Sequence, residues 1–529
     1  KRARRVGGFV RCARGKAGSE MRMGARWLVA ASLPAAMSRL ILLLSSFAIL
    51  HSAFSAQPNV IFLLADDLGQ RDLGCYGSTF YETPNLDRLA KEGALFTNGY
   101  AACPVCSPTR AAVQTGRWPQ RTGVTDYIGA AKTPDAWKRN TRLLPAPYVD
   151  RLAHDEVTMG EMMKAAGYAT FFAGKWHLGP EGFWPENQGY DINMGGVDRG
   201  GPYGPGKYFT PYANPRLPDG PPGEHLPDRL ATETCKFIEA NKSKPFFACY
   251  AFYDVHTPLN ARADLTAKYE AKRQKLGLEP KFGREGPRDV RLVQEHAIYA
   301  AMVEAMDLAV GKILAKLDEL DLAKNTLIIF TSDNGGLSTS EGSPTSNLPL
   351  RGGKGWLYEG GIREPLLVRW PSIVKAGQTI DTPVCSPDYF ATLMDVAGGK
   401  TTSKIDGVSL RPLLEGKGDL PKRALCWHYP HYGNQGGAPG AAIRRGDWKL
   451  IQWFERPDAP ELYNLREDLS EMQNLATQQP ERVKTLLAEL QAWQTEVGAL
   501  MPTKNTGYDP SKPDGRAAAA AKASKKKKR

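Results

Sequence analysis

The sequence predicts an α/β protein in which helices flank a mostly parallel or mixed central sheet, followed by a smaller α+β domain with a short antiparallel sheet. Two observations lead to this prediction. Short, continuous apolar runs, typical of strands buried on both faces, alternate with segments of helical periodicity. From about residue 416 the pattern changes to short strand-like segments separated by turns. The first pattern indicates a parallel α/β sheet and the second a separate unit.

The expected elements follow one another along the chain. Strands are predicted at residues 59–65, 169–172, 246–252, 327–330 and 365–368. The clearest helix spans 295–320, where apolar residues recur at steps of three and four. Gly/Pro-rich residues 200–223 are expected to be irregular, and loops of that length are usually functional or disordered. In the C-terminal part we expect strands at 424–429 and 448–453 and a helix near 480–497.

The positive charge of the chain is confined to its two ends. Among 529 residues, 69 are Lys or Arg and 56 are Asp or Glu, which gives a net charge of +13. Residues 1–56 carry ten basic side chains and one acidic one, and residues 516–529 carry seven basic ones and no acid. The body between them is therefore slightly acidic, which argues against a nucleic-acid-binding domain.

Residues 1–56 are predicted to be an upstream segment and a secretory signal peptide. Arg39 precedes an apolar run at 40–50, and small residues follow at Ala53, Ser55 and Ala56. Spanning a bilayer takes roughly 20 apolar residues, so no stable membrane span is expected; the alternative is a buried core helix. We therefore expect an exported protein, periplasmic or extracellular.

Three further parts are expected after the signal. They are a large domain at 57–415, a smaller C-terminal domain at 416–502 that completes the pocket, and a disordered basic tail at 503–529. The seven cysteines of these parts are too few, and odd in number, for a disulfide-stapled scaffold. At least one thiol is left for another purpose.

Oxygen-bearing side chains follow two of the predicted strands. In sheets of this kind, ligands bind at the carboxyl ends of the strands. Asp66 and Asp67 come directly after the first strand, and Asp333 and Asn334 come after the strand at 327–330. An isolated acidic pair is more often a solvated turn. Two such groups in one domain, however, are suited to closing a single Ca²⁺ or Mg²⁺ site.

Basic side chains follow two other predicted strands. Lys175 and His177 come after the strand at 169–172, and His256 comes after the strand at 246–252. A single histidine is more often structural. Two histidines, a lysine and several acids at neighbouring strand ends indicate a functional site.

The most specific segment contains Cys103 and Cys106. Their Cys-x-x-Cys spacing is compatible with a redox pair, whereas a zinc site would need a second such motif, which the sequence lacks. Alternatively, Cys106 begins a helix, with Arg110 one turn later on the same face. A helix N-terminus and a fixed guanidinium favour an anion, and together they suit a tetrahedral oxyanion.

Cys106-Ser107-Pro108-Thr109-Arg110, continued by Thr115-Gly116-Arg117, resembles the signature of the formylglycine-dependent sulfatases, of the arylsulfatase type in the alkaline-phosphatase-like superfamily. The resemblance extends from residue 59 to about residue 500 and includes motifs at 65–69, 174–179, 331–335, 351–354 and 359–365. Val113-Gln114 departs from the pattern, because relatives more often carry two leucines there. The resemblance implies a sulfuric ester hydrolase with its catalytic domain at 57–415.

In this family a maturation enzyme oxidises the cysteine to a formylglycine aldehyde, which makes Cys106 the expected nucleophile. The resemblance implies Ca²⁺, in preference to Mg²⁺, with these ligands: Asp66, Asp67, Asp333, Asn334 and the oxygen of the modified Cys106. Arg110 would hold the modified residue and offset its charge.

The other catalytic residues are expected around the sulfate group. The resemblance implies that Lys175 and Lys354 bind its oxygens, with His177 and His256 beside it. By analogy, one oxygen of the aldehyde hydrate attacks sulfur and displaces the alcohol. His256 protonates the leaving oxygen, with Lys354 as the competing acid. His177 takes the proton of the second hydroxyl as sulfate is expelled.

The expected substrate is a sulfate ester, with a sulfated carbohydrate as the preferred class. His431 is a candidate substrate-binding residue of the smaller domain, although packing of an aromatic turn explains it equally well. Three alternatives stay open: a phosphodiesterase or phosphonate monoester hydrolase of the same superfamily, a non-catalytic polyanion-binding relative, and a Cys103/Cys106 thiol–disulfide protein.

Overall fold

A nine-stranded sheet runs through the centre of residues 57–515, the part of the chain that the computed structural model describes. The strand order is β11-β2-β10-β9-β1-β6-β4-β5, and β12 also pairs with β2. The strands are β1 (Asn59–Ala65), β2 (Ala94–Tyr100), β4 (Ala169–Gly174), β5 (Ile192–Met194), β6 (Phe246–Ala251), β9 (Thr326–Ser332), β10 (Arg363–Arg369), β11 (Gln378–Ile380) and β12 (Val384–Cys385). Only β10 is antiparallel to its neighbours, so the sheet is mixed, as expected.

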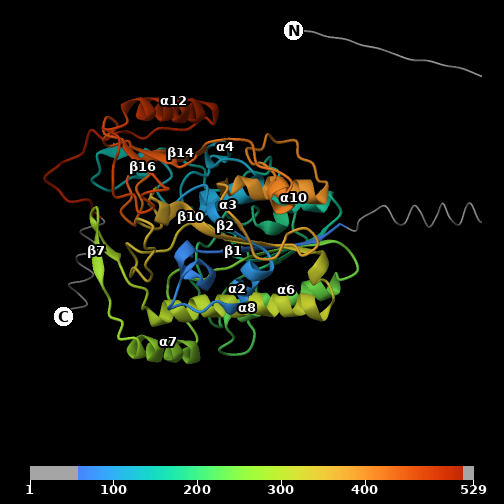
Figure 1. Ribbon diagram of the computed structural model, residues 1–529. Coiled ribbons are helices and arrows are strands. Elements are labelled where there is room, and N and C mark those ends of the chain that lie inside the picture. The colour runs from blue at the N-terminus through green and yellow to red at the C-terminus, as the bar shows by residue number, and fades with distance from the viewer. Residues whose placement is uncertain (1–56, 516–529) are drawn as a thin grey trace, which may run out of the picture. The chain divides into compact units, whose positions relative to one another are not determined.

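Helices cover both faces of this sheet (Figure 1). One face carries α2 (Pro84–Glu92), α6 (Leu226–Ala240) and α8 (Ala297–Glu319), with α7 (Ala263–Lys275) packed on α8. The other carries α3 (Cys106–Thr115), α5 (Met159–Ala165) and α10 (Pro387–Ala397). Alternate residues of β1 enter the two apolar cores, Ile61 on one side and Phe62 on the other. Burial of both faces explains why β1 is a continuous apolar run.

A second, four-stranded antiparallel sheet lies in the C-terminal part, with α12 (Pro480–Glu496) against it (Figure 1). Its strands are β13 (Leu425–Tyr429), β14 (Gly440–Arg445), β15 (Trp448–Trp453) and β16 (Glu461–Asn464). Leu486 and Leu490 of α12 belong to the same apolar cluster as Ile443 and Leu450 of the sheet. The expected small antiparallel sheet is therefore confirmed, while the boundary at 415/416 stays a prediction.

Shorter elements complete residues 57–515. They are the hairpin β7 (Phe282–Glu285) and β8 (Arg288–Arg291), the pair β3 (Leu143–Leu144) and β17 (Thr503–Lys504), and the short helices α4 (Pro119–Thr122), α9 (Glu359–Ile362) and α11 (Arg411–Leu414). Single 3₁₀ turns lie at Gln70–Asp72, Gly74–Tyr76, Pro134–Ala136, Pro185–Asn187 and Ala323–Asn325.

Residues 503–515 differ from the disordered tail that we expected. β17 pairs with β3, the side chain of Asn505 donates to the carbonyl of Thr141 at 2.8 Å, and Asp514 pairs with Arg139. These contacts could not be predicted from the polar composition of the segment, because their partners are more than 350 residues away in sequence. The rest of the tail and the predicted signal peptide lie outside the described residues.

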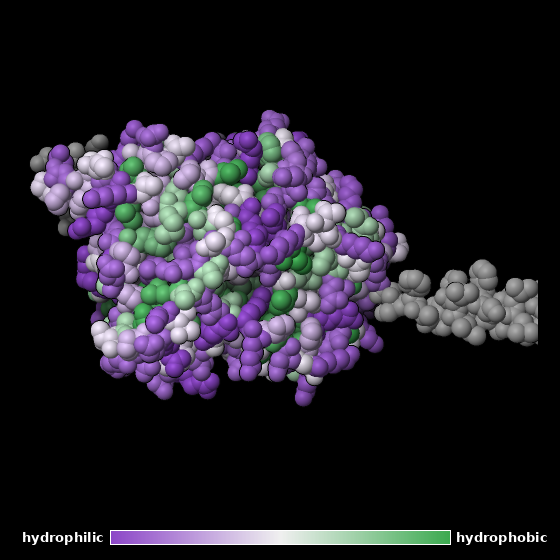
Figure 2. Space-filling model, turned by 90° about the horizontal axis from the view of Figure 1, so that it is seen from above, coloured by the Kyte–Doolittle hydropathy of each residue, from purple (hydrophilic) through white to green (hydrophobic). Residues whose placement is uncertain are grey.

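The surface seen in Figure 2 is mostly hydrophilic, with apolar side chains in small groups. Within residues 57–515, no helix combines the length and apolar character needed to cross a bilayer. Residues 200–223 form no regular element apart from two isolated bridges, as expected from their Gly and Pro content.

Candidate active site

Four adjacent parallel strands, β4, β6, β1 and β9, end at one edge of the main sheet. The residues that follow them are Lys175 after β4, Asp254 after β6, Asp66 after β1 and Asp333 after β9. Parallel strands bring their carboxyl ends to the same edge, so this gathering is the one that the sequence predicted.

Helix α3 begins at Cys106 and is buried along its whole length. One turn later, Arg110 donates from Nε to Oδ2 of Asp333 at 2.8 Å and from Nη1 to the carbonyl of Lys175, also at 2.8 Å. These bonds fix the guanidinium against the sheet edge. Gln114, the departure in the motif, is buried and accepts a hydrogen bond from Tyr190 at 2.9 Å, so its polar group is satisfied.

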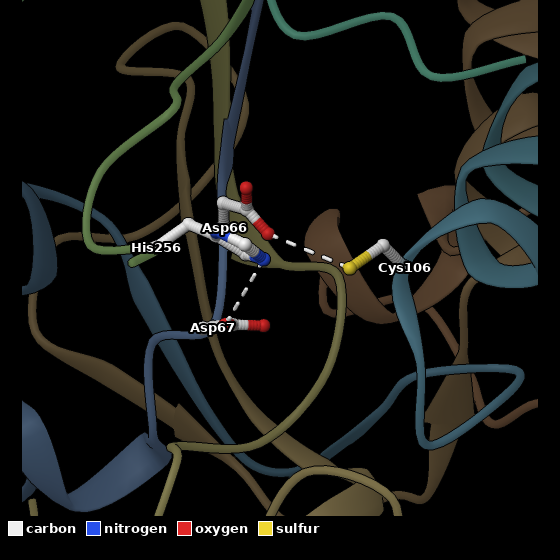
Figure 3. A group of neighbouring side chains, drawn as sticks. All are labelled: Asp66, Asp67, Cys106 and His256. Carbon is white, nitrogen blue, oxygen red and sulfur yellow. Dashed lines mark hydrogen bonds and ion pairs between the residues drawn. The ribbon is translucent and has the colours of Figure 1, made fainter. Parts of the chain in front are cut away.

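Four potential metal ligands meet in front of this edge (Figure 3). Ligand atoms of Asp66, Asp67, Cys106 and His256 all lie within 4.8 Å of one another, and all four residues are buried. Sγ of Cys106 is 3.7 Å from Oδ1 of Asp66, and Nε2 of His256 is 3.7 Å from Oδ2 of Asp67. His256 was expected beside the sulfate and was not among the predicted ligands.

Two buried lysines compensate the acids. Nζ of Lys175 is 2.6 Å from Oδ2 of Asp66, and Nζ of Lys354 is 2.8 Å from Oδ2 of Asp67. Burial raises the pKa of Asp66 to about 8, in spite of the Lys175 ammonium. Burial also acts on Asp67, but the ammonium charges of Lys354 and Lys175 outweigh it and hold the pKa of Asp67 below its ordinary value.

The other two predicted ligands adjoin Asp67. Oδ1 of Asp333 accepts from the amide of Asp67 at 3.3 Å, and Nδ2 of Asn334 donates to Oδ1 of Asp67 at 2.8 Å. Oδ1 of Asn334 is buried and has no hydrogen-bond partner within residues 57–515. Because a buried carbonyl-type oxygen normally has a partner, this atom next to carboxylates fits a cation ligand.

Close backbone contacts hold the loops of the site together. The amide of Gly335 donates to the carbonyl of Gly361, and a Cβ at Gly335 would collide with the carbonyl oxygen of Gly360. Asp67 and His177 adopt left-handed backbone conformations, with φ of 60° and 57°. Such strained conformations in non-glycine residues concentrate at functional sites.

The two predicted catalytic histidines, His177 and His256, are neutral at neutral pH. Burial, with the nearby lysine charges adding to it, holds the pKa of His177 and of His256 well below the ordinary value. Nδ1 of His256 donates to the carbonyl of Thr257 at 2.5 Å, which leaves Nε2 as the basic atom facing Asp67. Nε2 of His177 donates to the carbonyl of Ile128 at 2.8 Å, and its Nδ1 accepts from Ser107 at 3.2 Å.

A cavity of about 250 Å³, the reaction pocket, opens above this cluster. Four of the predicted residues line it: Cys106, His177, His256 and Lys354. Six further predicted residues are buried and are not part of its lining: Asp66, Asp67, Arg110, Lys175, Asp333 and Asn334.

The rim of the reaction pocket was not predicted. It is formed by Tyr127, Tyr203, Glu341, Asn434 and Gln435. Only the Gly/Pro-rich loop that contains Tyr203 carried a signal in the sequence, because loops of that length are often functional. The others lie in irregular segments whose path depends on tertiary contacts.

His431 does not line the reaction pocket. It is 1% exposed, its Nε2 is hydrogen-bonded with Thr125 at 3.0 Å, and its ring packs against Tyr148 and Tyr429. The smaller C-terminal sheet region reaches the pocket through Asn434 and Gln435 instead. The structure therefore favours the packing alternative for His431.

The two cysteines of the Cys-x-x-Cys motif are buried thiols, and neither is in a disulfide. Burial raises the pKa of Cys106 to about 12, although Lys175 and Lys354 act to lower it, and burial raises the pKa of Cys103 well above its ordinary value. Redox-active cysteines have low pKa values and solvent access. Neither holds here.

Comparison with known proteins gives a consistent result. The family model "Sulfatase" matches residues 58–399, and the model "N-sulphoglucosamine sulphohydrolase, C-terminal" matches residues 353–496. A sulfatase of Formosa agariphila is 32% identical over 83% of this chain and 88% of its own length. N-acetylgalactosamine-6-sulfatase of Mus musculus is 34% identical over 79% of this chain and 76% of its own length. The crystal structure of Ps i-CgsB with k-i-k-neocarrahexaose has a TM-score of 0.69 at 27% identity and covers 85% of this chain and 95% of that chain.

Proposed function

Because this chain belongs to the sulfatase family and is a sulfuric ester hydrolase, we propose that it removes sulfate from a sulfated carbohydrate, using a formylglycine made from Cys106 and a bound Ca²⁺. One observation carries the proposal: Cys106, at the start of α3, belongs to a buried cluster with two compensated carboxylates, two lysines and a histidine. Each of these groups matches a need of sulfate transfer.

Residue 106 is a poor nucleophile as a thiol. Its raised pKa keeps the sulfur protonated at neutral pH, and the thiolate is the reactive form. A sulfur adduct would also lack a second hydroxyl from which sulfate could be expelled. The hydrate of an aldehyde would supply both the attacking oxygen and that hydroxyl.

The donors present fit a hard divalent cation. Carboxylate oxygens of Asp66 and Asp67, with Asp333 beside them and the unpartnered Oδ1 of Asn334, form an oxygen-rich group of the kind that Ca²⁺ prefers. Bound there, Ca²⁺ would lower the pKa of the nucleophile and offset the charge of the sulfate. The ligand set that we propose is Asp66, Asp67, Asp333, Asn334 and the oxygen of modified residue 106.

The lysines and Arg110 supply the positive charge around the sulfate. Lys354 lines the reaction pocket and is assigned to a sulfate oxygen. Lys175 is assigned to another oxygen, because its ammonium, which pairs with Asp66, has three N–H donors. Arg110, held by Asp333, keeps a fixed charge next to residue 106, and such pre-set charges stabilise the transition state.

The histidines are assigned to proton transfer. His256 lines the reaction pocket and is assigned as the acid that protonates the leaving oxygen, with Lys354 as the competitor. Since its pKa is low in the free site, His256 must take up a proton when the anionic ester binds. His177, also in the pocket lining, is assigned as the base for the second hydroxyl: its Nδ1 receives the proton once Ser107 no longer donates to that atom.

The carbohydrate substrate is inferred from two kinds of support. The similar proteins include an N-acetylgalactosamine-6-sulfatase and a structure solved with a neocarrahexaose. The rim of the reaction pocket also offers carboxylate, amide and phenol groups, which suit hydroxyl-rich ligands. We further propose that the protein is exported and meets a formylglycine-generating enzyme during its maturation.

Side-by-side kinetics with 4-nitrophenyl sulfate and bis(4-nitrophenyl) phosphate test the reaction class. We expect a kcat/KM for the sulfate ester that exceeds that for the phosphodiester, and loss of this activity in Cys106→Ala and after chelation of Ca²⁺. Cys103→Ser is the matched control and should keep most of the activity. A large preference for the phosphodiester would instead support the phosphodiesterase alternative, and loss of activity in Cys103→Ser would support the thiol–disulfide one.

A further inference from the structure

A second cavity adjoins the reaction pocket. It has a volume of about 170 Å³ and shares two lining residues, Tyr127 and Asn434, with the reaction pocket. The two cavities are therefore neighbours on either side of a common wall. Nothing in the sulfate chemistry described above uses the second one.

One side of the second cavity is aromatic and firmly held. The rings of Trp137 and Tyr432 stack with centroids 5.7 Å apart and planes at 26°. The guanidinium of Arg139 lies 5.1 Å from the Trp137 ring and 5.6 Å from the Tyr432 ring. Arg139 is in turn tied to Asp514, with Nε 2.7 Å from Oδ1, so the segment 503–515 braces this wall.

The accessible charge of the second cavity is positive. Lys138 is exposed, and its Nζ donates to the backbone carbonyl of Asp135 at 3.2 Å. The carboxylate in the lining, Asp126, is 3% exposed and accepts hydrogen bonds from Tyr429 and from the amide of Tyr127. A ligand in this cavity therefore meets the lysine more readily than the carboxylate.

We propose that the second cavity binds the sugar residue next to the sulfated one, and that it favours a residue with an anionic group; this rests on the sulfatase function proposed above. Aromatic side chains with a few polar groups are the usual lining of ligand sites, and sugar rings present apolar C–H faces to them. Lys138 recognises the anionic group, which a carboxylate or a second sulfate would provide.

Substrate size and charge test this proposal in the full chain. The substrates are 4-nitrophenyl sulfate, a sulfated monosaccharide, and disaccharides that extend this monosaccharide by a second sugar. The second sugar is neutral, carries a carboxylate or carries a second sulfate. We expect the best substrate to be a disaccharide with an anionic second sugar, with kcat/KM about tenfold above that of its monosaccharide. Turnover of the aryl sulfate without any gain from a second sugar would overturn the subsite and leave the sulfatase function standing.

Variants of the wall sharpen the test. In Trp137→Ala and Lys138→Ala, the ratio of kcat/KM for that disaccharide to kcat/KM for the aryl sulfate should fall about three- to tenfold, mainly through KM. Lys132→Ala is the matched control, because Lys132 is an exposed lysine nearby that pairs with Asp150 and lines neither cavity. An unchanged ratio in both wall variants would overturn the subsite, whereas no turnover of any sulfate ester would refute the proposed function instead.

Discussion

Lys175 and Asp66 form an ion pair from which water is excluded: the ammonium lies 2.6 Å from the carboxylate, and neither side chain is exposed. A buried charge without a partner is strongly destabilising, so each member depends on the other. The pair also links the end of β4 to the end of β1, the two strand ends that carry the sulfate-binding lysine and the first metal ligand of the proposed site.

Lys175→Met leaves Asp66 without its ammonium. We expect the free energy of unfolding, measured in EDTA at pH 9, above the raised Asp66 pKa of about 8, to fall by about 3–5 kcal/mol. Added Ca²⁺ should restore much of this loss, because a ligand that binds the folded state stabilises it. Urea midpoints with and without Ca²⁺ measure both effects. Lys132→Met, which breaks the exposed pair with Asp150, should cost about 0–1 kcal/mol; equal losses in the two variants would contradict the prediction.

His256→Ala should slow sulfate esters according to their leaving group. A positioned acid contributes about 10²–10⁴-fold to a step that needs a proton, and little where the leaving group departs unprotonated. We therefore expect a large loss of kcat with a sugar sulfate and a much smaller one with 4-nitrophenyl sulfate. Equal losses with both substrates would speak against His256 as the acid, and the same comparison on Lys354→Ala then tests the competitor.

Glu341 places a carboxylate at the rim of an anion-binding pocket. Its oxygens accept hydrogen bonds from Thr257 at 3.1 Å and from Gln435 at 3.0 Å, which fix it there. Glu341→Gln removes a repulsive charge, so KM for 4-nitrophenyl sulfate should fall about two- to fivefold at low ionic strength, and less at high salt. A raised KM would show that Glu341 contributes binding rather than repulsion.

Lys449 holds two buried glutamates, with Nζ 2.9 Å from Glu359 and 2.8 Å from Glu471. Burial raises the pKa of Glu471 to about 7. Burial also acts on Glu359, but the charges of Lys449, Arg363 and Arg444 lower its pKa to about 2. Glu359 therefore stabilises the fold at pH values above its ordinary pKa of 4.5, and this contribution is lost as the pH falls toward 2. Glu471 has the opposite dependence: its contribution is present below pH 4.5 and is lost as the pH rises to about 7.

Lys449→Met should therefore be most costly in alkaline solution. At pH 8 both glutamates are ionised, and the variant leaves Glu471 without a cation while Glu359 keeps Arg363, 3.2 Å away. We expect the free energy of unfolding to fall by about 3–5 kcal/mol. At pH 5.5 Glu471 is protonated, so the loss should be smaller. Urea midpoints at the two pH values check this, and a loss that is the same at both would contradict it.

The sequence was most informative where burial on both faces left a continuous apolar run. β1 and β15 have the bounds that the pattern predicted, and α8 begins two residues later and ends one residue earlier than expected. Because parallel strands end at one edge, the sequence alone predicts that the residues after them lie close together. The short edge strands, such as β5 and β11, have too few residues for a recognisable period.

The rim of the site could not be predicted in the same way. Glu341, Asn434 and Gln435 lie in irregular segments, and they reach the reaction pocket through contacts between distant parts of the chain. His431 shows the opposite error: an aromatic, histidine-rich turn resembles a pocket wall in sequence, but its apolar rings are buried against Tyr148 and Tyr429.

The chemical state of residue 106 decides the mechanism. Peptide mass spectrometry of the segment that contains it, on protein whose turnover of 4-nitrophenyl sulfate has been measured, determines that state. We predict that the active preparation carries the aldehyde or its hydrate at position 106, in proportion to its activity, while Cys103 in the same peptide stays a thiol. A fully active preparation in which residue 106 is an unmodified cysteine would contradict the formylglycine mechanism.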